Sequence, residues 1–453
     1  MLSRLPGQVR ATLGRVRHAD TQSLATRLNL TILTSVLILF ANVGSGIILA
    51  RALGPVGRGI LTAALLFGPL IASVGSVGIA DALVYISGRS RGARTPGLVT
   101  ALWIAVPQSL VLFIAGWAVI PLFLRPSSHL AINPALAYLP IIPVFFLSQY
   151  PLAVLQGRLR LVEFNLVRVS APIVYTATVA VLWRLNALTV GTTVVASLFS
   201  GGFACFLALP AAARFSTRHF SQAAATELLA YGARSQAGNL ATILMAQLDL
   251  LMLAALVPTR DLGYYVVATS AAMTGSLIPS AASLVLFPTF ASQSSQAAQR
   301  ALARFLMWGV GGAVLLTPVI LFVVPWAVVP IYGPAFTAAS SLSAILVPAY
   351  LLRGTNQMLV AILRGSGSPA RASAGQVVGL AILAASLPIG IATGGVHGAA
   401  LALIVSAAVA FVWLLTNAWR HGRLSFQDAA LVWRSDLTRL YRGIRRLPAA
   451  TYQ

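Results

Sequence analysis

The chain has 453 residues, of which 58% are hydrophobic and only 9% are charged, and its formal net charge is +23. Soluble domains carry about 25% charged residues, so this composition cannot supply a water-facing surface and predicts a membrane protein. A nucleic-acid-binding protein is excluded, because the basic residues lie in short segments between apolar runs and form no basic domain.

Apolar runs long enough to cross a membrane recur along the whole chain. A span needs about 20 mostly apolar residues. Twelve runs meet this length: 29–50, 60–86, 97–124, 136–156, 165–183, 188–210, 234–256, 264–290, 304–326, 338–363, 372–393 and 396–419. The first begins late for a cleaved signal peptide. We therefore predict an all-α polytopic membrane protein with about 12 transmembrane helices.

The arginines alternate with these runs. The chain has 31 Lys+Arg residues and no lysine; the even-numbered gaps and the two tails hold 25 arginines, the odd-numbered gaps hold 5, and Arg353 falls inside a span. Cytoplasmic loops of membrane proteins are enriched in Lys and Arg. The alternation predicts a multi-pass protein of the cell inner (cytoplasmic) membrane with both termini cytoplasmic.

The C-terminal tail has a separate character. Apolar residues from Trp433 to Ile444 recur at a spacing of three to four, interleaved with arginines. This pattern predicts an amphipathic helix on the anionic inner leaflet. A solvated basic tail is the alternative.

The two halves repeat weakly at an offset of about 204–209 residues. Gln149 and Gly157 match Gln357 and Gly365, and the first gap, 52–59, is similar to 255–263. Six spans in each half fit parallel repeats related by an axis along the membrane normal. The predicted organisation is a basic tail (1–28), an N-terminal six-helix lobe (29–210), a cytoplasmic linker (211–233), a C-terminal six-helix lobe (234–419) and a basic tail (420–453).

Short motifs in a fixed order resemble a known family over roughly residues 28–420. They are Leu49-Ala50-Arg51-Ala52-Leu53-Gly54-Pro55-Val56-Gly57-Arg58-Gly59, Gln247-Leu248-Asp249-Leu250-Leu251, Asp261-Leu262-Gly263-Tyr264-Tyr265, Leu363-Arg364-Gly365-Ser366-Gly367 and Gly395-Val396-His397-Gly398-Ala399. Together they resemble the polysaccharide and O-antigen flippase branch of the multidrug/oligosaccharidyl-lipid/polysaccharide exporter superfamily.

The resemblance implies two six-helix lobes related by a pseudo-twofold axis, V-shaped around a central, partly cationic cavity. It also implies a flippase that translocates a polyprenyl-diphosphate-linked oligosaccharide, an O-antigen or exopolysaccharide repeat unit, by alternating access. The alternatives are a cation-coupled multidrug exporter of the same superfamily and a non-transporting scaffold of a glycan assembly complex. The major-facilitator fold also has twelve spans, but the gap 87–94 lacks the acidic residue typical of that fold.

Charged residues in or beside the spans are the candidate binding residues, since a charge within the bilayer faces the protein interior or water. Arginine suits a diphosphate, because its planar fork donates two parallel hydrogen bonds. We predict Arg51 and Arg353 as diphosphate or glycan contacts, with Asn356 and Gln357 as glycan partners. Anchoring at the interface is the alternative for Arg51, and a structural contact between helices is the alternative for Arg353.

Asp249 is a possible ion-coupling residue in the seventh span; a structural pair with Arg260 or Arg51 is the alternative. No catalytic constellation, metal-ligand spacing or phosphate-binding loop is present, and Cys205 is the single cysteine. The sequence therefore predicts no enzyme, no cofactor and no metal. The expected partners are the lipid-linked glycan, membrane lipids and glycan polymerase or ligase machinery.

Overall fold

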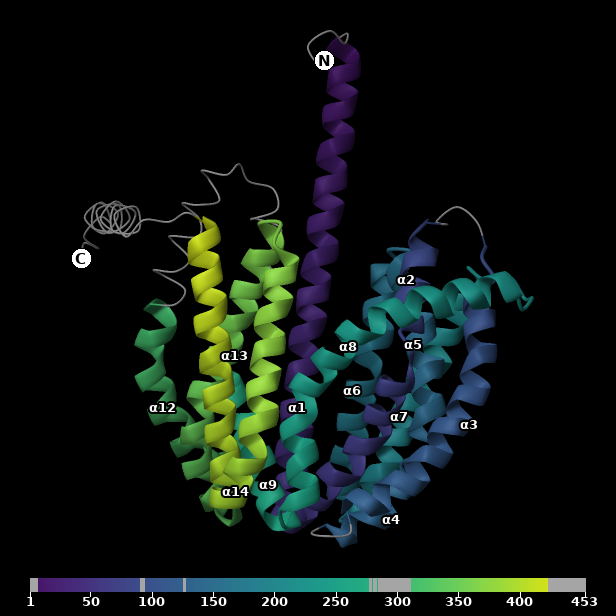
Figure 1. The fold of residues 1–453 in the computed structure, drawn as a ribbon. Coiled ribbons are helices and arrows are strands. Elements are labelled where there is room, and N and C mark those ends of the chain that lie inside the picture. The colour runs from purple at the N-terminus through teal and green to yellow at the C-terminus, as the bar shows by residue number, and fades with distance from the viewer. Residues whose placement is uncertain are drawn as a thin grey trace, which may run out of the picture. The chain divides into compact units, whose positions relative to one another are not determined.

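The computed structural model describes residues 7–89, 94–124, 128–276, 279, 283 and 311–422. The chain divides into two compact units (Figure 1). Unit 1 comprises residues 1–53 and 60–240, and unit 2 comprises residues 54–59 and 241–453. The predicted C-terminal amphipathic helix, the inner gap 300–304 and most of the span after Ser276 lie outside the described residues.

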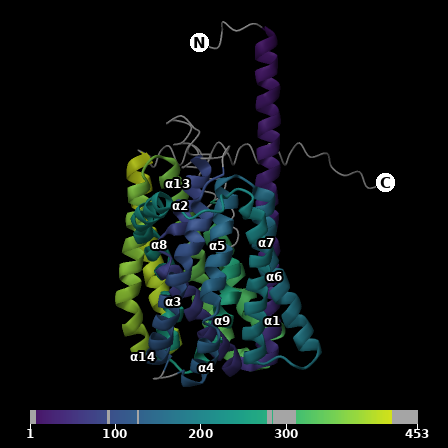
Figure 2. The same ribbon diagram turned by 90° about the vertical axis from the view of Figure 1, so that its right-hand side faces the viewer.

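Helices account for nearly all of unit 1. They are α1 (Gly7–Gly75), α2 (Ile79–Arg89), α3 (Gly97–Leu124), α4 (Ile132–Ala137), α5 (Ile141–Gly157), α6 (Leu161–Arg184), α7 (Val190–Ala213) and the first part of α8 (Gln222–Leu256). The N-terminal end of α1 extends beyond the other helices of the unit (Figure 2). The predicted linker segment 211–233 lies wholly in unit 1, and α8 already begins within it.

Unit 2 contains the rest of α8, α9 (Thr259–Ala272), α12 (Gly311–Tyr332), α13 (Thr337–Gly365) and α14 (Pro369–Gly422). Within this unit α13 packs against α9, α12 and α14. As a result, most of its side chains are buried.

Seven of the described helices are long and apolar enough to cross a membrane, or eight if the bent pair formed by α4 and α5 is one span. The two longest, Leu33–Gly75 and Pro369–Arg420, each contain one glycine with non-helical backbone angles, Gly54 and Gly395. Pro369–Arg420 therefore accommodates two of the predicted spans, and the helix that ends at Gly75 accommodates the first predicted span and part of the second. The prediction of an all-α polytopic membrane protein is confirmed.

The second predicted span differs from expectation, because it is broken. α1 ends at Gly75 and α2 begins at Ile79. Between them, Val77 and Gly78 both have positive φ. A break leaves carbonyl oxygens without helical partners. Side-chain amides supply the donors here: Gln236 donates to Ser73 (3.3 Å) and to Val74 (2.8 Å), and Gln108 donates to Gly75.

Two of the turns that follow helix C-termini share one backbone hydrogen-bond pattern. In the α5–α6 turn, the backbone amide of residue 158 donates to the carbonyl oxygen of residue 154, that of 159 to 156, and that of 160 to 155. In the α13–α14 turn, the amide groups of 366, 367 and 368 donate to 362, 364 and 363, the same pattern 208 residues later. The central residue of each turn, Leu159 or Gly367, has a positive φ. The amide groups of residues 185, 186 and 187 after α6 donate in the same way to residues 181, 183 and 182, so the pattern is a general helix C-terminal motif and does not by itself relate the two halves.

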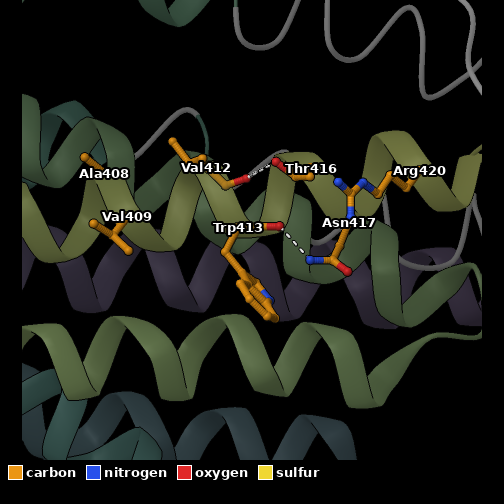
Figure 3. Close-up of a pocket in the computed structure, with 7 residues that line it drawn as sticks. All are labelled: Ala408, Val409, Val412, Trp413, Thr416, Asn417 and Arg420. Carbon is orange, nitrogen blue, oxygen red and sulfur yellow. Dashed lines mark hydrogen bonds between the residues drawn. The ribbon is translucent and has the colours of Figure 1, made fainter.

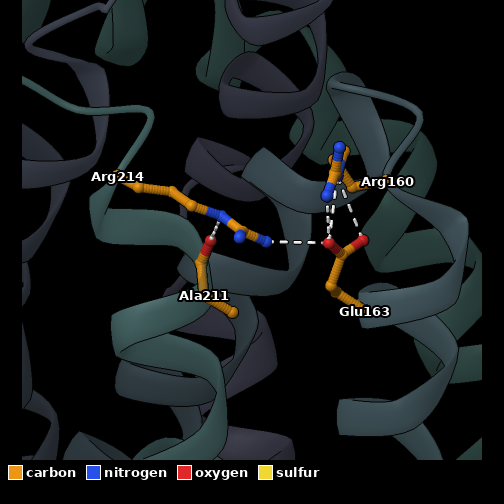
Figure 4. A network of polar contacts seen from close by, with 4 residues as sticks. All are labelled: Arg160, Glu163, Ala211 and Arg214. Atoms are coloured by element: carbon orange, nitrogen blue, oxygen red, sulfur yellow. Dashed lines mark hydrogen bonds and ion pairs between the residues drawn. The ribbon is translucent and has the colours of Figure 1, made fainter.

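The α5–α6 turn also shows how the inner arginines are used. Glu163 accepts hydrogen bonds from Arg160, and it also accepts one from Arg214 at 2.8 Å (Figure 4). The hydrogen bonds to Glu163 raise the pKa of Arg160 above its ordinary value. The guanidinium groups of Arg158, Arg160 and Arg214 all lie within 6 Å of the ring of Phe215. These arginines therefore connect the ends of α5, α6 and α7.

Candidate functional site

A buried carboxylate lies where α8 and α9 meet in unit 2. Asp249 is only 2% exposed, and its Oδ2 accepts a hydrogen bond of 3.0 Å from the Tyr265 hydroxyl group. Its Oδ1 is buried without a hydrogen-bond partner. No ion pair to Asp249 exists among the described residues. Burial of a carboxylate with a single hydrogen bond is costly.

Arg353 of α13 lies close to this carboxylate. Its Nη2 donates to the carbonyl oxygen of Met245 in α8 at 2.6 Å, and its guanidinium lies 5.6 Å from the centre of the Tyr350 ring. Tyr265 and Tyr350 each interact electrostatically with both Asp249 and Arg353. Three helices thus bring together one acidic, one basic and two phenolic side chains, which we call the unit 2 polar cluster: Asp249, Tyr265, Tyr350 and Arg353.

The two amides predicted to contact a glycan have different environments. Asn356 is 7% exposed, and its Nδ2 donates to the carbonyl oxygen of Ala407 in α14 at 3.0 Å. Its Oδ1 is buried without a hydrogen-bond partner. Gln357, the next residue, is exposed. The donor of Asn356 is therefore occupied by a contact between helices, whereas Gln357 is accessible.

Arg51 belongs to unit 1 and Arg353 to unit 2. The Arg51 side chain is exposed and lies three residues before Gly54, where α1 is kinked. Of the five predicted site residues, unit 2 holds four, and it brings two of them, Asp249 and Arg353, into one cluster.

Sequence reasoning missed the two tyrosines of the polar cluster. Tyr350 precedes Arg353 by one helical turn, which is a signal that a search for polar neighbours on one helix face could have used. Tyr265 carries no such signal, because it meets Asp249 only through the packing of α8 on α9. The alternative pairing of Asp249 with Arg260 is not observed: Arg260 donates to the Tyr264 hydroxyl group at 2.9 Å.

The described residues contain no group of three or more His, Cys, Asp or Glu side chains that could hold a metal ion. In the polar cluster a single carboxylate faces a cation and two hydroxyl groups.

Long apolar helices with ionisable side chains buried between them are the architecture of a multi-pass membrane protein. The chain belongs to the polysaccharide biosynthesis protein family, whose model matches residues 48–341. No curated protein sequence matches the chain.

Solved transporter structures share this fold. The lipid II flippase MurJ in an inward closed conformation is similar with a TM-score of 0.63 at 14% identity, covering 94% of this chain and 94% of that chain. A multidrug resistance MATE family transporter of the MOP superfamily, inward-facing, has a TM-score of 0.60 at 16% identity over 87% of this chain and 99% of that chain. The MATE multidrug transporter DinF-BH has a TM-score of 0.61 at 15% identity over 89% and 96%. The chain therefore has the fold of the MOP superfamily.

Proposed function

We propose that this protein is a flippase that moves a polyprenyl-diphosphate-linked oligosaccharide across the inner membrane by alternating access, with both termini in the cytoplasm. Two findings support the proposal: membership of a polysaccharide biosynthesis family, and a fold shared with a lipid II flippase. Glycan polymerase or ligase machinery would act on the product at the membrane, and anionic lipids would contact the C-terminal tail.

Arg353 is the observation that carries the proposal. It is a half-buried cation within a span, and of its five N–H donors one contacts Met245 and another hydrogen-bonds Tyr350. The remaining donors suit a diphosphate oxygen, since guanidinium binds such groups in a bidentate manner. Arg51 is the proposed second contact, and Gln357 and the Oδ1 of Asn356 are the proposed glycan partners.

Asp249 is the proposed coupling residue. Its unpartnered Oδ1 offers a place for a proton or a monovalent cation, and Tyr265 fixes the other oxygen. Asp249 and Arg353 belong to one polar cluster, in which the Tyr265 hydroxyl group donates to Asp249 and the Arg353 guanidinium lies over the Tyr350 ring. Uptake of an ion and release of a diphosphate would in this way be linked within one unit.

Replacement of Asp249 by asparagine is expected to abolish the response of transport to an ion gradient, since the amide keeps the shape but cannot bind a proton or cation. The measurement uses the purified protein in vesicles with a polyprenyl-diphosphate-linked disaccharide as probe. Transfer is read as exposure of the sugar to an oxidant that cannot cross the membrane. We expect gradient-stimulated transfer to fall at least about tenfold, equivalent to about 1.4 kcal/mol.

The matched control is Asp261→Asn, which changes a carboxylate in the first turn of α9 outside the polar cluster. This variant should retain gradient stimulation. Normal stimulation in Asp249→Asn, with the protein correctly inserted, would rule out coupling at this carboxylate.

A multidrug exporter is the second candidate, because two of the matched folds belong to multidrug transporters. The same vesicles separate the candidates. Accumulation of an organic cation without transfer of the disaccharide lipid would favour the exporter, and neither activity would favour a scaffold.

A further inference from the structure

A groove of about 500 Å³ lies along the last part of α14 (Figure 3). Val409, Val412 and Trp413 form its apolar wall, and Asn417 and Arg420 lie at one end. Trp413 and Asn417 point to the same side of the helix, and the Arg420 side chain extends back along it (Figure 3). The groove lies outside the unit 2 polar cluster and has no part in the function proposed above.

The groove is built by packing within unit 2. The Trp413 ring lies against Gly375, where an added Cβ would come within 3.0 Å of its Cδ1. The Asn417 Nδ2 donates to the carbonyl oxygen of Trp413 at 2.9 Å, which leaves the amide oxygen as an acceptor. The groove lining includes no acidic side chain, and no ion pair to Arg420 occurs in the described part of the chain. Within the described residues, the polar end therefore presents the positive charge of Arg420 beside a hydrogen-bond acceptor.

The dimensions match one leaflet of a bilayer. Eleven residues separate Val409 from Arg420, and at 1.5 Å per residue they span about 16 Å. This is close to half of the roughly 30 Å hydrocarbon core of a membrane. Val412 and Trp413 are 61% and 41% exposed, so the wall between the two ends is open to lipid. A ligand that fits this groove has an anionic head group and an apolar chain as long as one leaflet is thick.

We propose that this groove binds an acidic phospholipid of one membrane leaflet, with phosphatidylglycerol as the representative ligand. The phosphate accepts hydrogen bonds from the Arg420 guanidinium. A hydroxyl group of the glycerol head donates to Oδ1 of Asn417. One acyl chain follows Trp413, Val412 and Val409 into the membrane. Basic pockets at the ends of membrane helices bind such head groups.

Native mass spectrometry of the purified full-length protein tests this proposal, with phosphatidylglycerol or phosphatidylcholine added in increasing amounts. We expect preferential binding of phosphatidylglycerol. Arg420→Gln should lower its occupancy about tenfold, the order of effect of losing one charged contact. Val412→Trp should lower it as well, by filling the groove while leaving Arg420 in place.

The matched control is Arg364→Gln, which removes an arginine from the last turn of α13 that is equally exposed to solvent. It should leave the preference unchanged. Size-exclusion profiles verify that each variant is folded. Unaltered phosphatidylglycerol binding in Arg420→Gln would overturn the proposal, and so would equal binding of phosphatidylcholine. Full competition by inorganic diphosphate would also overturn it, because the site would then bind free phosphate and not a lipid.

Discussion

Alanine at position 59 is expected to prevent the chain from reaching its native fold. Gly59 and Gly263 cross at contact distance within unit 2, and a Cβ on Gly59 would overlap the carbonyl oxygen of Thr259. The contact is reciprocal, because a Cβ on Gly263 would overlap the carbonyl oxygen of Pro55. Backbone atoms cannot yield as a flexible side chain can, so the expected cost is about 3 kcal/mol or more.

The yield and melting temperature of the detergent-solubilised protein distinguish this steric clash from the general effect of replacing a glycine in a helix. Gly59→Ala should give little monodisperse protein and a lowered melting temperature. Gly202→Ala is the control, since its Cβ would meet nothing within 4 Å and α7 gains a better helix former. Equal yield and melting temperature for the two variants would contradict the close crossing at Gly59.

Removal of the Arg353 side chain is expected to reduce transport of the lipid-linked oligosaccharide by about 10- to 100-fold, the effect of losing hydrogen bonds to a charged group. The variant Arg353→Ala removes both the proposed diphosphate contact and the cation of the unit 2 polar cluster. Arg353→Lys should restore part of the activity, because it keeps the charge without the planar fork. The measurement is the vesicle transfer assay with equal amounts of inserted protein.

Arg260→Ala is the matched control for Arg353. It removes an exposed arginine. Within the described residues, the contacts of Arg260 are with the ring and the hydroxyl group of Tyr264. Transport in this variant should be close to that of the native protein. Full transport by a normally inserted Arg353→Ala would remove Arg353 from the proposed substrate site.

The membrane spans could be predicted because apolar length and arginine placement are local properties of the sequence. The span 97–124, for example, coincides with α3. The break between Gly75 and Ile79 could not be predicted in the same way. It depends on amide donors from Gln108 and Gln236, which lie far away in the sequence. A helix can be interrupted inside a membrane only where such distant groups satisfy its backbone.

The candidate site also contains residues that the local sequence could predict and residues that it could not. Asp249 and Arg353 were identifiable because charged residues are rare within spans. Tyr350 had a local signal, its place one turn before Arg353, but Tyr265 had none, since its contact with Asp249 arises from the packing of α8 on α9. The bond from Asn356 to the carbonyl oxygen of Ala407 was equally invisible, because the two residues are 51 positions apart.

The position of the lipid-linked oligosaccharide in cells lacking this protein tests the proposed function most directly. The gene is deleted, and the leaflet holding the intermediate is determined with a membrane-impermeant sugar-modifying reagent on intact and on permeabilised cells. We predict that the intermediate accumulates in the cytoplasmic leaflet and that surface glycan is lost, with both restored by the native gene. Normal surface glycan with no accumulated intermediate would contradict the flippase function.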